Sequence, residues 1–492
     1  MKKIFTIAMV ITLVAALTLP AMAETKFSFK GAYRVRGFML SNPSLQADQA
    51  KVKATGAAGK ASETLAIAAE GEGPSQSYLD MRFRMQSKFT VSDRLAVVTR
   101  FDALDGKKYG EGDTVGTKRN IDWDRAYMVI KADFGTFQIG RMEGEAYGND
   151  FLDSGTERDR IAFDAKMDKW TLSLIYEKQD EGDAGTVLTD ADFDVYYAGA
   201  AYKSEDLTGG VLFGYAFDKT DSDILAYVPA AGNLGWDSTR FDINPFIDAS
   251  FGDFGVNAEA LLRFGKYQEY DRDVYNDSIK LADAARKGMG LGPLPDVDYD
   301  AYAWNIEGTW ASGPFSAELG YVWVKGEDDP YDDKYESVGG VGADWGKVFI
   351  LTNTDSGFEG TLGGHSGAAA AGATEGNLGE EGSSAATNGC KMFYIGGSYA
   401  PLDNVKIKGL IANSKSESPG YVDLGGLPAD SRNFASDHGT EYDLTVDWDI
   451  YDNLSYTAIL AYLDAGDYWQ YGNPYRELEN TWCFWQQLKL SF

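Results

Sequence analysis

The sequence has few of the residues that build metal centres, disulfide frameworks or hydrolase active sites. Its 492 residues include only two cysteines and two histidines. Cys390 and Cys483 cannot form a disulfide framework, although an exported chain could join the two. His365 and His438 have no cysteine or histidine neighbour at ligand spacing, and no matched serine or acidic constellation. We therefore expect neither an enzyme nor a cofactor.

Basic residues are scarce relative to acidic ones. The chain carries 45 Lys and Arg against 75 Asp and Glu, a formal net charge of −30. Such a chain repels phosphate, so nucleic acid is not an expected partner. An acidic run at 327–333 has the clustered carboxylates that Ca²⁺ favours, but it lacks the glycine-centred loop of a calcium motif. We expect a solvated acidic loop there and no metal site.

Long apolar runs are absent after the first twenty-odd residues. Lys2 and Lys3 precede the uncharged apolar stretch Ile4–Leu19, and a small-x-small site follows at 21–23. This order predicts a secretory signal peptide over residues 1–23. An uncleaved anchor is the alternative, but the stretch is shorter than the ~20 residues of a spanning helix. The remainder, 24–492, is either a secreted soluble protein or a β-barrel, which hides its apolar residues by alternation.

The composition and the periodicity favour the barrel. The chain has 29 Tyr, 26 Phe and 11 Trp, which suit the aromatic belts of a barrel, and 56 Gly for its bends and turns. Apolar and polar residues alternate over segments of ~9–12 residues, the pattern of membrane strands. In one such segment the apolar parity is Val256, Ala258, Ala260, Leu262 and Phe264. The intervening positions include Asn257, Glu259 and Arg263.

The connections between these segments alternate between short and long. The short, turn-like ones lie at 92–94, 133–135, 168–169, 252–253, 312–314, 403–404 and 451–453. The long, polar ones lie at about 40–76, 142–157, 219–237, 268–297, 326–390 and 416–438. We therefore predict one all-β domain, a transmembrane antiparallel β-barrel of about 18 strands, with 16 as the alternative. Short periplasmic turns and long extracellular loops would join the strands.

The longest connection, 326–390, has two parts of contrasting composition. Residues 355–390 are rich in Gly, Ala, Ser and Thr, which predicts a loosely folded low-complexity segment. The stretch Trp345–Leu351 is apolar, and we expect a strand or a helix there, within the loop.

The last residues carry the most specific pattern. Apolar residues alternate up to a terminal aromatic: Trp482, Phe484, Leu488, Leu490 and Phe492. This ending resembles the signal that outer-membrane barrels present to their assembly machinery, so Phe492 is the expected assembly residue. The resemblance implies a location in the outer membrane of a Gram-negative bacterium. The expected partners are outer-membrane lipid, lipopolysaccharide and the barrel-assembly machinery.

If the apolar parity faces lipid, the opposite parity lines the lumen. The basic residues of that parity are Lys30, Arg34, Arg36, Arg82, Arg84, Lys88, Arg100, Arg125, Arg158 and Arg160. The acidic ones further along the chain are Asp242, Asp248, Glu259, Glu307, Glu318, Asp443, Asp447 and Asp449. Strands far apart in the order stand on opposite walls, so these charges would set a transverse field that orients polar solutes. The alternative is that they pair with lateral neighbours and hold the strands in register.

A stretch of about twenty residues resembles a motif of bacterial porins. It comprises Ile121-Asp122-Trp123-Asp124-Arg125-Ala126-Tyr127, Phe134-Gly135 and Ile139-Gly140-Arg141. The resemblance implies that the following loop, 142–157, folds into the channel and narrows it. Its acidic residues are Glu143, Glu145, Asp150, Asp153 and Glu157. Met142 departs from the motif, in which Gln usually follows Gly-Arg. Size and strand number also resemble the alginate-export and substrate-specific porins, which have basic channels.

Three functions are compatible with these features. The first is a channel for passive diffusion of small hydrophilic solutes, with a weak preference for anions because the basic residues lie on adjacent strands. The second is a substrate-specific channel for an anionic saccharide or carboxylate. The third is a structural or adhesive barrel whose lumen is plugged, with loop 326–390 as plug or binder. The oligomer is a homotrimer or a monomer.

Overall fold

The computed structural model describes most of the chain. The described residues are 25–45, 75–111, 121–144, 146–182, 192–220, 236–270, 283–284, 287–288, 292–329, 332–364, 374–418, 435–472 and 477–492. The signal peptide expected at 1–23 lies outside them, as do Glu145 and His365.

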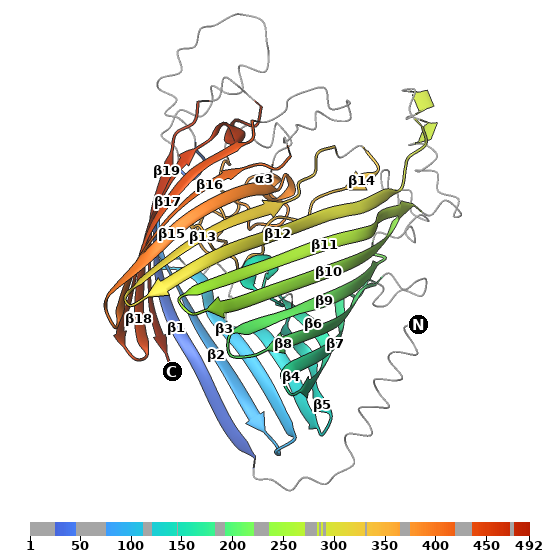
Figure 1. The fold of residues 1–492 in the computed structure, drawn as a ribbon, viewed down its shortest axis with the longest axis vertical. Helices are drawn as coiled ribbons and strands as arrows, with labels where there is room; N and C mark the ends of the chain where they lie inside the picture. Colours follow the sequence, from blue (N-terminus) through green and yellow to red (C-terminus); the bar gives the residue numbers. More distant parts are fainter. Residues whose placement is uncertain are drawn as a thin grey trace, which may run out of the picture.

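Eighteen antiparallel strands form one closed barrel, which confirms the expected fold (Figure 1). The first nine are β1 (Lys26–Ser41), β2 (Gln76–Thr90), β3 (Leu95–Lys108), β4 (Asp122–Ala132), β5 (Gly135–Glu143), β6 (Glu157–Met167), β7 (Trp170–Asp180), β8 (Phe193–Lys203) and β9 (Leu207–Asp218). The others are β10 (Trp236–Phe251), β11 (Phe254–Tyr270), β12 (Val297–Ser312), β13 (Phe315–Val324), β15 (Cys390–Leu402), β16 (Val405–Lys415), β17 (Asp437–Tyr451), β18 (Leu454–Ala465) and β19 (Thr481–Ser491). A nineteenth, β14 (Lys334–Tyr335), pairs in parallel with β12 and adds nothing to the barrel wall.

Few other elements are present among the described residues. They include α3 (Ser384–Thr387) and two 3₁₀ turns, η3 (Asp150–Leu152) and η6 (Asp467–Gln470). In the part of the chain that the structure describes, no helix is long and apolar enough to cross a membrane.

The outer face of the wall is apolar, as the alternation predicts. Large aliphatic side chains there are each about half exposed: Ile306, Leu319, Ile395, Leu444 and Leu460. Exposure of this kind over many neighbouring strands is the mark of a lipid-facing surface. The opposite parity of the same strands is polar or covered, so the barrel has a lipid face and a lumen face.

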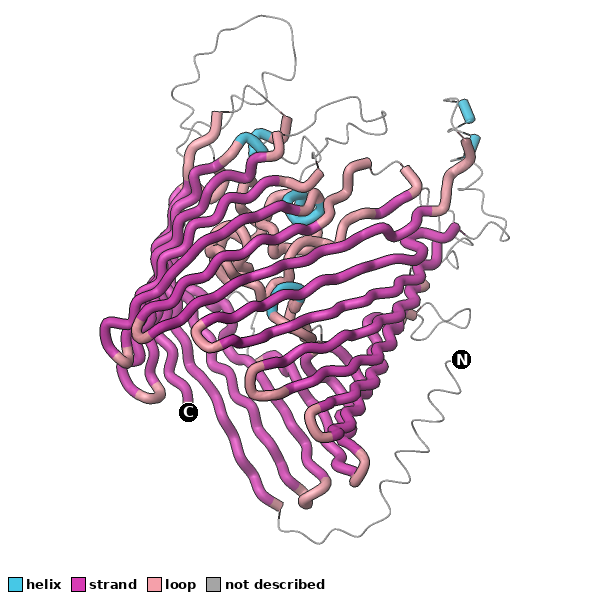
Figure 2. The backbone as a smooth tube through the Cα atoms, viewed as in Figure 1, coloured by secondary structure: helices cyan, strands magenta, loops and turns pink. Residues whose placement is uncertain are grey.

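Short turns and long loops occupy opposite ends of the barrel, as expected (Figure 2). Eight turns of two to four residues close the hairpins, including one at 204–206 that the sequence pattern does not single out. Gly252 and Gly313 have φ of +64° and +57° in two of these turns, and Asp168 has +53° in a third. Glycine and aspartate tolerate this left-handed conformation, which tight turns need.

The barrel closes where β19 pairs with β1, in the register that the parity predicts. Arg34 lies opposite Lys489, so the closing seam adds a lysine to the basic residues of β1. Gly31 and Phe492 exchange both backbone hydrogen bonds, at 2.8 and 3.0 Å. A Cβ on Gly31 would lie only 2.7 Å from the Phe492 ring. The terminal ring therefore covers a gap in the seam that a glycine leaves for it.

We predict that Phe492→Ala lowers the yield of folded barrel, because the ring packs against Phe29 and Phe83 across the seam at centroid distances of 6.3 and 6.1 Å. The folded fraction can be measured as the heat-modifiable band on electrophoresis after expression. Phe251→Ala removes an exposed ring, at 66% against 47% for Phe492, from a distant hairpin and is the control. Equal losses in both variants would mean that Phe492 has no special part in assembly.

The described parts of the connection between β13 and β15, residues 325–329, 332–364 and 374–389, fold back into the barrel. Its apolar side chains join those of the inner wall in one buried cluster, with Val348, Ile350, Leu351, Phe358, Leu362 and Leu378 essentially inaccessible. We call residues 332–364 and 374–389 the insertion. It forms most of the pink loop drawn within the ring of strands in Figure 2.

Two expectations about the insertion were wrong. Residues 345–351 form neither a strand nor a helix but a buried turn. The described parts of 355–390 are closely packed rather than loose: the Asn377 amide donates to the carbonyls of Ile350 and Asn353, at 3.2 and 3.0 Å. A Cβ on Gly340 would lie 2.3 Å from the Leu378 carbonyl oxygen. The small residues therefore permit close backbone packing, a role that composition alone does not distinguish from flexibility.

Candidate functional site in the barrel interior

The loop between β5 and β6 crosses the interior of the barrel. From its start beside β5 it reaches β8 and β11: the Tyr147 hydroxyl donates to the Ala200 carbonyl at 3.2 Å, and the Asn149 N–H donates to Glu259 at 3.2 Å. The Asn149 amide also donates to Asn257, at 2.9 Å. Strands β6 and β11 are not neighbours in the wall. A loop that leads into β6 and also contacts β11 therefore crosses the lumen.

The insertion contacts the wall at three separated places. Lys347 binds Glu318 of β13 at 2.7 Å. Two carboxylates of β17, Asp443 and Glu441, accept from the consecutive backbone N–H groups of residues 349–351. Beyond the closing seam, Asp355 accepts from Arg36 of β1 at 2.7 Å. The insertion is therefore fixed along an arc of the wall that runs from β13 through β17 to β1, across the seam.

The two loops are joined to each other. The N–H of Gly342 donates to the Phe151 carbonyl at 2.8 Å, and the N–H of Asp344 donates to the Asp153 carbonyl at 3.0 Å. The rings of Phe151 and Trp345 meet edge to face at 5.4 Å. A Cβ on Gly342 would lie 2.3 Å from the Asp153 carbonyl oxygen, so this approach requires glycine. The joined loops stand opposite the arginines of β1–β6.

Those arginines form one continuous surface, which we call the arginine wall: Arg34, Arg36, Arg82, Arg84, Arg100, Arg125, Arg158 and Arg160. Arg36 holds Asp80 through two nitrogens at 3.0 and 2.6 Å, and Arg84 holds Asp102 likewise at 2.7 and 2.6 Å. Bidentate pairs of this kind fix a guanidinium in direction as well as position. The side chains that separate neighbouring arginines are therefore carboxylates of the same wall.

The arginine wall continues through β3–β6 with the same chemistry. Arg100 binds Asp124 at 2.9 Å and also Glu157, and Arg125 binds Glu143 at 2.7 Å. Arg158 and Arg160 both lie near the fully buried Glu177, at 3.7 and 2.9 Å. Lateral pairing, the alternative interpretation of the lumen charges, is thus a prominent feature of this wall.

The remaining predicted basic residues stand apart from this network. Lys30 and Lys88 lie near the turn end of β1 and β2 and are exposed. Asp248 on β10 is exposed as well. None of these three is brought together with the arginines.

The predicted acidic residues of the opposite wall each have their own partners. Asp242 is held by Arg240 and Arg263, at 3.1 and 2.9 Å, so this wall also contains arginines. Glu259 is buried and accepts from the Asn244 amide at 2.9 Å. The others pair as follows: Glu307 and Glu318 with Lys347, Asp447 with Lys408, and Asp443 with the Phe349 N–H.

Carboxylates of the two crossing loops form an acidic edge that faces the arginine wall: Glu143, Asp150, Asp153, Asp344 and Asp355. Burial raises the pKa of Asp344, and its neighbours Asp150 and Glu143 raise it further by repulsion. Burial works against the charged form of Asp355 too, but Arg36 and Arg34 outweigh it and lower the pKa of that carboxyl. The acidic edge is therefore most firmly ionised where it meets the arginines.

Asp153 gives the acidic edge a pH dependence in the physiological range. Burial raises the pKa of this carboxyl to about 7, although the Tyr147 N–H that it accepts works the other way. Because the folded-state pKa is raised, the carboxyl is charged at pH 8 and neutral at pH 5.5. We predict that acidification across this window shifts the reversal potential in a salt gradient toward anions. Asp153→Asn should shrink the shift, whereas the turn variant Asp168→Asn should retain it; equal shifts would exclude Asp153.

Several residues of this site were not among those predicted from the sequence. Asp80 and Asp102 have the lumen parity, so the alternation marks them as candidate partners of the arginines. Asp124 has the opposite parity to Arg125 and reaches the lumen through a bulge in the pairing of β3 with β4. Lys347 and Asp355 lie in a connection without periodicity, so no sequence signal marks them.

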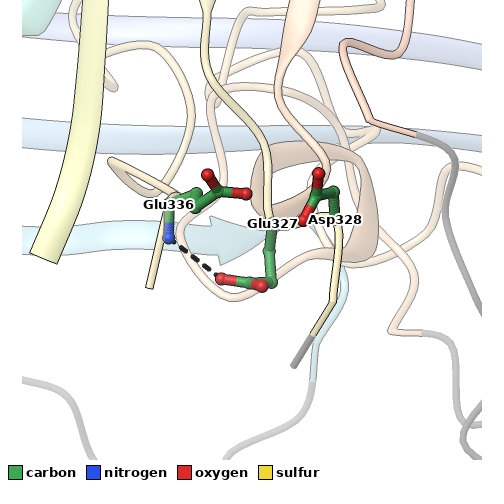
Figure 3. A group of neighbouring side chains, drawn as sticks. All are labelled: Glu327, Asp328 and Glu336. Atoms are coloured by element: carbon green, nitrogen blue, oxygen red, sulfur yellow. Dashed lines mark hydrogen bonds between the residues drawn. The ribbon is translucent and has the colours of Figure 1, made fainter. Parts of the chain in front are cut away.

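A group of three carboxylates lies away from the acidic edge, near the start of the insertion (Figure 3). The ligand atoms of Glu327, Asp328 and Glu336 lie within 4.8 Å of one another. Glu327 accepts from the Glu336 N–H at 3.0 Å, and Glu336 binds Lys325 at 2.7 Å. Burial raises the pKa of Glu327 to about 7. Lys325 and the Glu336 N–H are thus partners of two of these carboxylates.

The cysteines and the described histidine lie in buried surroundings. Cys390 and Cys483 are both free thiols. His438 lies within β17; it is fully buried and its Nδ1 is 3.0 Å from the Ser414 hydroxyl. A residue enclosed in this way has no access to a substrate.

The closed 18-strand barrel, with its apolar outer face, polar lumen and crossing loops, defines a transmembrane β-barrel channel of the porin type. Residues 10–345 match the model of the Gram-negative porin family. The chain therefore belongs to that family and is an outer-membrane channel, not an enzyme. This result confirms the resemblance carried by the motif at 121–141.

Solved structures of similar size also align with the chain. OccK8 (OprE) of Pseudomonas aeruginosa shares 10% identity at a TM-score of 0.47, covering 94% of this chain and 98% of that one. OpdO of the same organism gives 10% and 0.47, covering 95% and 97%. Vibrio cholerae OmpT, described as a trimer form, gives 12% and 0.38, covering 96% and 100%. No curated protein sequence matches the chain.

Proposed function

We propose that this porin allows passive diffusion of small hydrophilic solutes along the arginine wall, past the acidic edge. The observation that carries the proposal is the meeting of two surfaces of opposite charge: Arg36 of the wall pairs with Asp355 of the insertion at 2.7 Å, and Arg82 and Arg84 on the neighbouring strand keep partly accessible side chains. Ordered charges of opposite sign on two sides of a wet passage orient dipolar solutes and disfavour apolar ones. Narrowing of the passage is assigned to the two joined loops.

The balance between the two surfaces sets the expected ion preference. Arg82 and Arg84 are the arginines of β1–β3 with the most accessible side chains, at 20% and 32%, whereas Glu143 and Asp355 reach 47% and 63%. Solute anions are expected to follow the arginines, but the exposed carboxylates oppose them. The preference for anions that adjacent basic strands suggest should therefore be weak.

Planar-bilayer recording with the purified full chain tests this proposal. Channel events are expected, with a small reversal potential in a KCl gradient. Absence of events in independently folded preparations would overturn it. A reversal potential near the limit for one ion would contradict the proposed balance of the two surfaces.

A second candidate is a substrate-specific channel for a carboxylate or an anionic saccharide. Arg34 and Arg82 lie opposite each other on β1 and β2. Their nearest carboxylate contacts are long, between 3.5 and 3.9 Å, and the Arg34 Nε has no hydrogen-bond partner. These two guanidinium groups retain capacity for an acceptor from a solute. Saturable block of the current by one carboxylate favours this candidate, and linear flux favours simple diffusion.

A plugged structural or adhesive barrel is the third candidate, since the insertion fills part of the lumen. Deleting 355–388 would then raise conductance from a very low value. Membership of the porin family makes a homotrimer the first oligomer to test, with a monomer as the alternative. A mass measurement in detergent distinguishes the two.

A further inference from the structure

Lys347 of the insertion sits in a socket on the wall opposite the arginines. Its ammonium group is paired with Glu307 of β12 and with Glu318 of β13, the latter at 2.7 Å. The same group lies 4.9 Å from the centre of the Tyr394 ring of β15. Burial disfavours the charged form, but the two carboxylates outweigh it and raise the pKa of Lys347. The lysine is therefore held as a cation by three adjacent strands.

Contacts among residues of the wall itself shape this socket. The Tyr394 hydroxyl donates to Glu307 at 2.6 Å, which fixes both side chains. Gly320, directly opposite Tyr394, leaves room for the ring: a Cβ there would lie 2.2 Å from it. Gly396 likewise leaves room for Glu318, whose oxygen would lie 2.9 Å from an added Cβ. Side chains and gaps on three strands are thus arranged around one position.

The chemistry of the socket suits a primary ammonium group. An ammonium group has three N–H donors, and two carboxylates accept them as charge-assisted hydrogen bonds. The face of an aromatic ring attracts the same cation through its quadrupole. A quaternary ammonium group lacks the donors and is wider. The socket should therefore discriminate between alkylammonium and tetraalkylammonium ions.

Lys347 lies between two contacts that hold the crossing loops in place. Two residues before it, Trp345 packs on Phe151 of the other loop. Two residues after it, Phe349 is bound by Asp443 of β17. Displacing the lysine from the socket therefore loosens the contacts on both sides of it.

We propose that the Glu307–Glu318–Tyr394 socket is an alkylammonium-binding site that Lys347 occupies as a tethered ligand. A solute carrying a primary ammonium group exchanges with the lysine and releases this part of the insertion from the wall. A tethered group competes at an effective concentration of the millimolar order. Exchange in the unmodified protein therefore needs a comparable concentration of the free amine. The proposal needs a channel but no particular solute preference.

The test begins with Lys347→Ala, which empties the socket and leaves its three wall residues in place. Ethylammonium should bind this variant in detergent by calorimetry and raise its Tm, because a ligand that binds only the folded state stabilises it. Tetramethylammonium should do neither. Adding Glu318→Gln to Lys347→Ala should abolish the response. Lys408→Ala breaks a lumen lysine–carboxylate pair for which no ring contact is found and is the matched control.

The unmodified porin supplies the functional readout. Ethylammonium at tens of millimolar should increase the frequency of current transitions in bilayers, and tetramethylammonium should not. In the absence of amine, Lys347→Arg should show no more current transitions than the unmodified porin. Equal ethylammonium responses of Lys347→Ala and Lys408→Ala would overturn the proposal. Absence of channel events in every variant would refute the diffusion function instead, and the calorimetry would still decide on the socket.

Discussion

Replacing Arg82 and Arg84 with glutamate should turn the channel clearly cation-selective. Both side chains are among the more accessible of the arginine wall, and the change replaces two positive charges beside the acidic edge with two negative ones. In a wet pore of this kind the local potential governs which ion enters. The expected result is a several-fold rise in the ratio of cation to anion permeability, obtained from the reversal potential in a KCl gradient.

Two comparisons make this result interpretable. Arg82→Gln removes charge without reversing it and should give an intermediate shift. Lys169→Glu with Lys203→Glu reverses two neighbouring charges at the turn end, where the Lys203 N–H donates to the Lys169 carbonyl, and should change selectivity little. An unchanged reversal potential in folded Arg82→Glu, Arg84→Glu barrels would mean that the side chains do not face the permeating ions.

Glu441→Gln should detach the insertion from β17 and raise the conductance. The Glu441 carboxylate accepts from the Ile350 and Leu351 N–H groups, at 2.5 and 2.9 Å, and it is completely buried. An intramolecular hydrogen bond stabilises by about 0.5–1.5 kcal/mol, and a buried donor left without a partner costs about 1–3 kcal/mol. The side-chain amide of glutamine has only one oxygen, so its NH2 group would face one of the two backbone N–H donors. At least one of the two hydrogen bonds is therefore lost, and the freed N–H group is better satisfied by water.

Release of the insertion has a direct chemical readout. Trypsin cleaves after lysine, and the bond between Lys347 and Val348 is protected while both residues are packed. In Glu441→Gln this bond should become sensitive and single-channel conductance should rise. The control is Asp452→Asn, in the turn between β17 and β18, which makes the same carboxyl-to-amide change at the far end of the strand. Full trypsin resistance together with unmodified conductance would show that β17 does not hold the insertion.

The barrel itself was predictable because its signal is local and repeated. Each strand satisfies the same two demands, an apolar side for lipid and paired backbone groups, so alternation recurs eighteen times. The closing pair obeys the same rule, since Lys489 of β19 lies opposite Arg34 of β1 with the lumen parity on both strands.

The interior was only partly predictable because it depends on contacts between distant segments. Arg36 was identified by its parity, but its partner Asp355 lies 319 positions away in a connection without periodicity. The low-complexity composition of 355–390 suggested looseness, whereas Gly340 is required by contact with a neighbouring backbone. Residue types that serve both flexible and closely packed chain leave this distinction to tertiary structure.

The position of the insertion constrains the order in which the protein assembles. The insertion binds Arg36 in the first strand, and Phe349 packs against Trp485 in the last strand, at a centroid distance of 5.6 Å. Strands β1 and β19 also form the seam. If the seam closed first, an apolar segment would have to pass through a finished polar opening to reach its place. We therefore expect the wall to close around an interior that is already folded, with sealing by Phe492 as the final step, which locks in a segment synthesised more than a hundred residues earlier.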